Sequence, residues 1–296
     1  MKSHTKDYLA LQGIVLLFSL TAIFGKLIEL PVAYMVTYRT FTAATIIGIL
    51  FYIKRPEKLT LKHLTHLLPL GAVLGIHWLL FFGSARLASV SLSLITVSTT
   101  TFFTSILEPL VKKHKWNIQE MILGILIVCG MGLIFQAESV HALGITVGLI
   151  SAFMGAIYMT ANSVVSKKYS SMTVNFLQLS GAFLICLPVA LWYQPRMQLI
   201  IPSSMDLVYL AILSILCTVV PYLILVSLLS RLSAFTVNLS INLEPVYGIL
   251  LALALFREDE QMKPGFYIGG AIILFAVIWN AIQERKNRRT AGIKAE

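Results

Sequence analysis

The segment "LSAFTVNLSINLEPVYGILLALALF", residues 232–256, is a long apolar run in which Glu244 is the only charged side chain. Pro245 follows this glutamate directly, and the same Leu-Glu-Pro tripeptide occurs earlier at residues 107–109. A helix needs about 20 mostly apolar residues to cross the hydrocarbon core of a bilayer. The run is long enough to do so, and it carries a carboxylate and a helix-breaking residue near its middle.

The whole chain has the composition of a membrane protein. Of its 296 residues, 57% are hydrophobic and only 12% are charged, and the mean hydropathy is +0.84. A soluble helical protein would need a polar face on most of its helices, and few of these runs have one. The net charge of +10 does not indicate nucleic-acid binding, because the basic residues form short clusters between apolar runs. We expect a lipid bilayer around the chain and no nucleic acid.

The three cysteines, Cys129, Cys186 and Cys217, lie in separate apolar runs. Their spacing fits neither a metal site nor a disulfide framework, so we expect packed thiols, no metal and no cofactor. Residues 1–22 resemble a secretion signal but lack a small-residue cleavage site, which predicts a retained first helix.

Cutting the chain at charged, proline-rich or glycine-rich breaks predicts ten membrane spans, and therefore both termini on one side. The predicted spans are 9–27, 32–53, 65–85, 88–111, 119–137, 142–165, 173–193, 206–229, 233–256 and 265–283. Cytoplasmic loops of membrane proteins carry an excess of lysine and arginine. With both termini cytoplasmic, 17 of the 23 basic residues fall in inside segments, five fall outside, and Arg39 lies within a span.

The chain contains an internal repeat with a shift of 145 residues. "RLASVSLSLITVSTTTFF" at 86–103 then aligns with "RLSAFTVNLSINLEPVYG" at 231–248, and Gly124 with Gly269. Each half has five spans, an odd number, so the two halves enter the membrane from opposite sides. An all-α fold of two inverted five-helix repeats, residues 1–137 and 138–284, followed by a basic tail at 285–296, is typical of secondary transporters.

Two segments resemble the EamA family of the drug/metabolite transporter superfamily. They are "PVAYMVTYRTFTAATIIGIL" at 31–50 and "SAFTVNLSINLEPVYGILLALALFREDEQMKPGFYIGGAIILFAVIW" at 233–279. The matching positions are Arg39, Ser233, Ala234, Glu244, Pro245, Glu258 and Gly269. The resemblance implies a protein of the bacterial inner membrane that exports small metabolites such as amino acids, or facilitates their movement.

The first half departs from the family pattern. Thr100 stands where the second half has Pro245, and the basic run "KKHK" at 112–115 replaces an expected glutamate. The shift therefore does not align the two Leu-Glu-Pro tripeptides. It predicts that Glu108 closes a helix near the cytoplasmic face, where it pairs with Lys112 at i+4, whereas Glu244 lies at mid-membrane.

Ionisable groups within the hydrocarbon region are costly and are functional candidates by default. Glu244 and Pro245 are either a hinge or proton site, with the carboxyl favoured in its neutral form, or a structural kink. Arg39 either pairs with Glu244, binds a substrate carboxylate, or extends toward the membrane interface. His77, beside Trp78, either serves the substrate or a proton path, or makes one bond between helices.

Uncharged polar residues near mid-span add further candidates for a pore or substrate site. Asn238 and Asn242 are spaced i, i+4 and share one helix face, while Glu244 points well away from it. Tyr158 and Asn162 have the same spacing. The remaining candidates are Thr96, Thr99, Thr100 and Tyr222. Three glycine pairs, Gly71/Gly75, Gly144/Gly148 and Gly265/Gly269, predict closely packed helices.

Three classes of function fit a polytopic membrane protein. The first is an alternating-access transporter of a small molecule, with proton coupling through Glu244 as one version. The second is a membrane enzyme acting on a lipid-linked substrate, which the sequence does not favour, because it has no zinc motif and no phosphate-binding loop. The third is an assembly protein without transport. The sequence leaves open the substrate, the direction of movement and a homodimer.

Overall fold

The computed structural model describes residues 2–54, 56–113, 118–193, 200–229, 241, 243–257 and 262–293, and these residues form helices without any strand. The first half contains α1 (Lys2–Leu27), α2 (Val32–Lys54), α3 (Leu61–Leu87), α4 (Val90–Ser98), α5 (Thr100–Lys112) and α6 (Ile118–Ala137). A short 3₁₀ turn, η1 (Ser139–His141), leads into the second half. That half contains α7 (Ala142–Val165), α8 (Ser171–Tyr193), α9 (Ser204–Ala211), the π-helix η2 (Ile212–Val219), α10 (Val220–Leu229), α12 (Glu244–Phe256) and α13 (Pro264–Ile293).

The helices follow the predicted spans closely, and α7 has the predicted bounds. Two predicted spans are divided. Span 88–111 breaks at Thr99 into α4 and α5, and span 206–229 passes through η2. Of the span predicted at 233–256, the structure describes residue 241 and residues 243–256, and α12 begins at Glu244.

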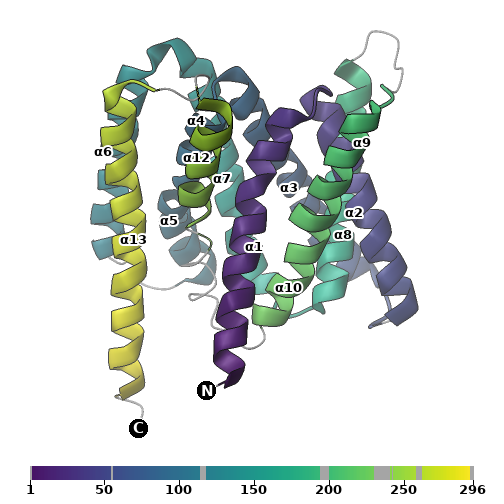
Figure 1. The fold of residues 1–296 in the computed structure, drawn as a ribbon. Helices are drawn as coiled ribbons and strands as arrows, with labels where there is room; N and C mark the ends of the chain where they lie inside the picture. Colours follow the sequence, from purple (N-terminus) through teal and green to yellow (C-terminus); the bar gives the residue numbers. More distant parts are fainter. Residues whose placement is uncertain are drawn as a thin grey trace.

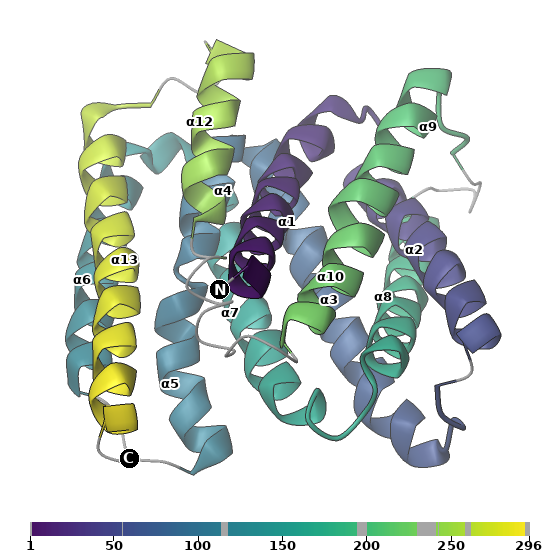
Figure 2. The ribbon, with the colours of Figure 1, turned by 60° about the horizontal axis from the view of Figure 1, so that its bottom comes forward.

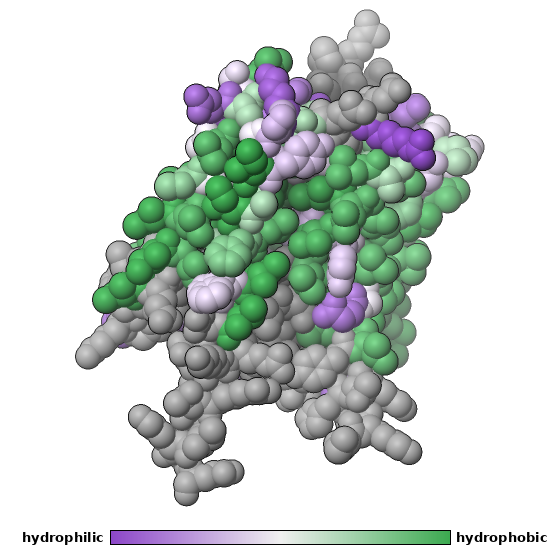
Figure 3. Space-filling view, turned by 60° about the vertical axis from the view of Figure 1, so that its left-hand side comes forward, coloured by the Kyte–Doolittle hydropathy of each residue, from purple (hydrophilic) through white to green (hydrophobic). Residues whose placement is uncertain are grey.

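Seven helical stretches in the described residues are long and apolar enough to cross a membrane. They lie in α1, α2, α3, α4–α5, η1–α7, α8 and α9–α10. Shorter apolar stretches occur in α6, α12 and α13. Figure 3 shows a side of the molecule that is mostly hydrophobic, with hydrophilic residues gathered toward the upper end. Large apolar side chains such as Ile122, Ile125 and Phe275 are more than half exposed, as expected for helices that contact lipid.

The helices form a bundle in which α1 begins and α13 ends at the same end of the molecule (Figure 1). We call this the terminal end. Figure 2 shows α6 and α13 paired at one side and α1, α9 and α10 grouped on the other. α3 packs against both α7 and α8, α2 against α8, and α12 against α4. Helices of the second half are therefore inserted among helices of the first.

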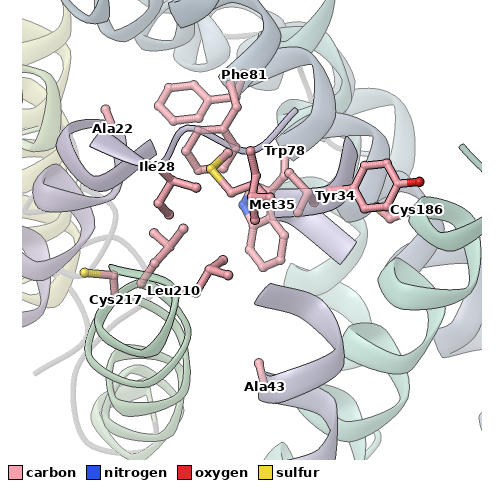
Figure 4. Close-up of a cluster of buried hydrophobic side chains, with 14 of the residues drawn as sticks. Ala22, Ile28, Tyr34, Met35, Ala43, Trp78, Phe81, Cys186, Leu210 and Cys217 are labelled. Atoms are coloured by element: carbon pink, nitrogen blue, oxygen red, sulfur yellow. The ribbon is translucent and has the colours of Figure 1, made fainter. Parts of the chain in front are cut away.

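A buried apolar cluster fills the region where the two halves meet (Figure 4). Its members come from α1, α2, α3, α4, α7, α8, α9, η2 and α12, and include Tyr34, Trp78, Leu210 and Cys217. The polar side chains described below lie against this cluster, so their surroundings are closely packed and mostly apolar.

The predicted role of the glycine pairs is confirmed. A Cβ added to Gly71 would overlap the backbone of Gln178 in α8, and one added to Gly181 would overlap the backbone of Leu68 in α3. Gly130 of α6 and Gly269 of α13 approach each other's carbonyl oxygens in the same way. Lipid tails are as apolar as leucine, so close backbone packing of this kind is a main source of association between membrane helices.

The tripeptide at 107–109 lies where the repeat predicts. Glu108 sits in the last two turns of α5 and forms an ion pair with Lys112. α5 ends at Lys112, and the next residue, Lys113, has the left-handed conformation with φ of 54°.

Substituting Gly71 with valine should force α3 and α8 apart. Overpacking typically costs about 1–3 kcal/mol, so we expect a lower thermal unfolding temperature in detergent. Gly132→Ala is the matched control, because an added Cβ there meets nothing within 4 Å, and alanine favours helix by roughly 1 kcal/mol. Equal unfolding temperatures for the two variants would show that this contact contributes little.

Candidate functional site

Arg39 is the centre of the polar side chains that lie between the two halves. It is 1% exposed, and its Nε donates a hydrogen bond of 2.8 Å to Thr218 Oγ1 in η2. The guanidinium carbon lies 4.1 Å from the ring centroid of Trp78 and 5.6 Å from that of Phe82. Stacking of this kind stabilises a cation more strongly once water is removed. The buried Nη1 has no hydrogen-bond partner in the described part of the chain.

The π-helix η2 brings Thr218 to Arg39. Thr218 donates its own hydroxyl hydrogen to the carbonyl oxygen of Leu213, five residues earlier, at 2.8 Å. Its oxygen is therefore oriented to accept from Arg39. π-helical turns often occur at functional sites, and nothing in the local apolar pattern of residues 212–219 predicts this one.

Glu244 approaches the same region from α12. It stands in the first turn of that helix, directly before Pro245, where the helix dipole favours a negative charge. Its charge interacts electrostatically with that of Arg39, although the described residues contain no direct ion pair between them. The sequence left three roles open for Arg39. Extension of its side chain to the membrane interface does not fit a side chain that is buried.

A second polar group adjoins Arg39. Tyr158 Oη donates to Gln178 Oε1 at 2.9 Å, and Gln178 Nε2 donates to Asn162 Oδ1 at 2.8 Å. Tyr222 lies within electrostatic range of Tyr158, and it packs edge-on against Trp78 with centroids 6.3 Å apart. The predicted shared face of Tyr158 and Asn162 is therefore present, and it meets Gln178.

Gln178 is the residue that the sequence reasoning missed. A signal for it existed: Gln178 is the eighth residue of the 23-residue α8, as Arg39 is the eighth residue of the 23-residue α2. Comparing the second helix of each half would have found it.

His77 joins helices α3 and α7. Its Nδ1 lies 2.8 Å from the carbonyl oxygen of Ser151, and the Ser151 hydroxyl donates to the carbonyl oxygen of His77 at 2.8 Å. This is the bond between helices given above as the alternative to a substrate or proton role. The histidine still lies within electrostatic range of Arg39.

The three threonines of the α4–α5 break do not join the Arg39 group. Thr96 and Thr99 bond to nearby carbonyls of their own segment, at 2.7 and 2.6 Å. Thr100 donates to Ala152 of α7 at 3.3 Å. Asn238 and Asn242 lie outside the described residues.

A groove of about 430 Å³ between α3 and α8 is lined by apolar residues and Thr65. Thr65, Pro69 and Leu184 are exposed, so this groove opens on the outer surface of the bundle. It is separate from the Arg39 group.

Several membrane-length apolar helices, with charged and hydrogen-bonding side chains held between them, define a multi-pass membrane protein. The model of the EamA-like transporter family matches the sequence twice, over residues 6–136 and 142–282. The chain therefore belongs to the EamA-like transporter family, and membership supports a membrane transporter rather than an enzyme.

Two further comparisons agree. An uncharacterized transporter of Haemophilus influenzae is 24% identical over 264 residues, which cover 84% of this chain and 85% of that protein. A protein of known crystal structure has the same fold, with a TM-score of 0.65 and 14% identity over 95% of this chain and 98% of its own.

The electrostatic interaction of Arg39 with Glu244 should appear in a double-mutant cycle. Arg39→Met and Glu244→Gln should each destabilise the protein, by up to about 3 kcal/mol, because each leaves the other group without its opposite charge. The double variant should lose less than the sum of the two. Thermal unfolding in detergent measures this, and strict additivity would mean that the two charges are uncoupled.

Proposed function

We propose that the chain is a secondary transporter that exports small metabolites, foremost amino acids, across the bacterial inner membrane by alternating access. The observation that carries the proposal is Arg39, a fully buried cation at the meeting of the two halves whose Nη1 has no hydrogen-bond partner among the described residues. Buried polar groups are normally satisfied, and an orphan donor at such a place suits a ligand that accepts hydrogen bonds.

We place this site in a bundle of ten membrane helices arranged as two inverted repeats, residues 1–137 and 138–284, with both termini and the tail at 285–296 cytoplasmic. The double family match supports the repeat. The helix starts support it too, because α5 begins at Thr100 and α12 at Glu244, which are 144 residues apart.

The contacts between helices are also symmetric, as an inverted repeat requires. Under the repeat, α1 corresponds to α7, α2 to α8, α3 to α9–η2–α10, and α5 to α12. The α5–α7 contact therefore corresponds to α1–α12, and the α3–α7 contact to those of α1 with η2 and α10. The α3–α8 contact corresponds to α2–η2. Exchanging the two halves leaves the pairs α6–α13 and α2–α8 unchanged, and all of these contacts are present.

The charges favour a zwitterion. Arg39 comes from the first half and Glu244 from the second, and they interact without a direct ion pair in the described residues. A substrate carboxylate would bind Arg39 and a substrate ammonium group would bind Glu244, so one amino acid would satisfy both. Trp78 and Tyr222 supply aromatic surface beside them, which suits an apolar side chain. Protonation of Glu244 would release the ammonium group, which is how proton coupling would operate.

Flux of radiolabelled amino acids in proteoliposomes tests this proposal. We expect transport of at least one apolar amino acid and at least tenfold weaker transport of its amide and of its decarboxylated amine. Arg39→Lys should reduce flux strongly, because lysine cannot reproduce the planar fork stacked on Trp78. Glu244→Gln should abolish dependence on a pH gradient.

Glu108→Gln is the matched control, since Glu108 is a glutamate beside a proline in an exposed helix end, and it should transport normally. If Glu244→Gln keeps the wild-type response to pH, proton coupling through Glu244 is wrong. If a broad metabolite panel shows no flux, the transport proposal itself is contradicted.

A further inference from the structure

Glu57 joins the two halves at the terminal end. It lies in the connection between α2 and α3, and its Oε1 accepts the backbone N–H of Ser170 at 3.0 Å and the hydroxyl of Thr173. Both partners belong to the start of α8. His63 Nε2 lies 3.4 Å from the other carboxylate oxygen. Partial burial raises the pKa of Glu57, but the hydrogen bonds from Thr173, Ser170 and His63 outweigh it, so the pKa lies below its usual value.

Asp206 joins the halves at the opposite end. It lies in the first turn of α9, is 5% exposed, and accepts the backbone N–H of Glu29 at Oδ1 over 2.9 Å. Glu29 belongs to the connection between α1 and α2. Ser203 donates to the other carboxylate oxygen at 3.0 Å. Arg86, which donates to the carbonyl oxygens at the end of α1, adds an opposite charge nearby.

These two contacts correspond to each other under the repeat. Glu57 lies shortly before the third helix of its half and Asp206 in the first turn of its counterpart, and each accepts an N–H from just before the second helix of the other half. Residues 57 and 206 are 149 apart and residues 29 and 170 are 141 apart, which brackets the shift of 145. The contacts lie at opposite ends of the bundle (Figure 1).

We infer that Glu57 and Asp206 are a pair of symmetry-related latches, each holding one end of the transporter closed across the two halves, and that they open alternately. The inference rests on the alternating access proposed above. A charge-assisted hydrogen bond is stronger than a neutral one, yet each latch is small enough to break and re-form. Both are closed in this structure.

Opening at one end should be favoured when the latch at that end is removed. A mutation shifts the equilibrium between two states only if it changes the free energy of one state more than that of the other. Glu57→Ala weakens closure of the terminal end alone, and Asp206→Ala weakens closure of the opposite end alone. The two variants should therefore shift the same equilibrium in opposite directions.

Cys217 is a natural reporter for this test. It is fully buried in η2, next to Thr218 of the Arg39 group, so a water-soluble thiol reagent reaches it only through an open end. Replacing Cys129 and Cys186 with alanine leaves Cys217 as the single thiol. The rate of its modification by a membrane-impermeant methanethiosulfonate is measured from each side, in right-side-out and inside-out vesicles.

We expect reaction from both sides in the parent protein. Glu57→Ala should change the ratio of the two rates about tenfold in favour of the terminal end, equivalent to about 1.4 kcal/mol. Asp206→Ala should change it in the opposite sense, and the double variant should return near the parent ratio. Thr173→Val, which removes one donor from the other half, should act like Glu57→Ala.

Glu138→Gln is the matched control. Glu138 is also a buried carboxylate that accepts a backbone N–H distant in the sequence, that of Lys263 at 2.6 Å, but it joins the ends of the peripheral pair α6 and α13. It should leave the ratio unchanged. Shifts in the same direction for Glu57→Ala and Asp206→Ala, with the parent reacting from both sides, would overturn the latches but not alternating access. A Cys217 unreactive from either side in the parent and all variants would contradict alternating access itself.

Discussion

The burial of the Arg39 guanidinium is the constraint on which the centre of this molecule depends. A guanidinium stays protonated in proteins, and a charge in the hydrocarbon region is costly, so the surroundings must compensate for it. Two aromatic rings from α3, one hydroxyl from η2 and the charge of Glu244 do so. Each comes from a different element, and the guanidinium therefore fixes how α2, α3, η2 and α12 are placed around it.

Close backbone contacts and polar segments occur on different helices. α3 and α8 touch backbone to backbone at Gly71 and Gly181, and α6 and α13 do so at Gly130 and Gly269. The polar segments, by contrast, lie at Thr99 between α4 and α5, in the π-helix η2, and at Glu244, where α12 begins. Broken helices are where transporters expose backbone groups, and these segments lie in other helices than the glycine contacts.

The sequence predicted the helices well because hydropathy and charge act locally along the chain. α7 has its predicted bounds, and the pairing of Glu108 with Lys112 needed only helical spacing. The partners of a side chain are a different matter. Thr96 lies against Gly148 of α7, and Arg39 meets Thr218 across 179 positions in the sequence. Local periodicity gives the face of a helix but not the helix that it meets, so it could not show that the threonines lie apart from the Arg39 group.

The repeat explains what local patterns could not. Arg39 is the eighth residue of α2 and Gln178 is the eighth residue of α8. Each is the polar side chain that the second helix of its half places near the centre. Arg39 is tied to the second half through Thr218, whereas Gln178 is tied to Tyr158 and Asn162 of its own half. Likewise Glu244-Pro245 stands where the first half has Thr99-Thr100. Symmetry of the backbone thus coexists with asymmetry of charge. In the transport proposal, such a site would present a cationic side from one half and an anionic side from the other, and it would therefore distinguish the orientation of a dipolar ligand.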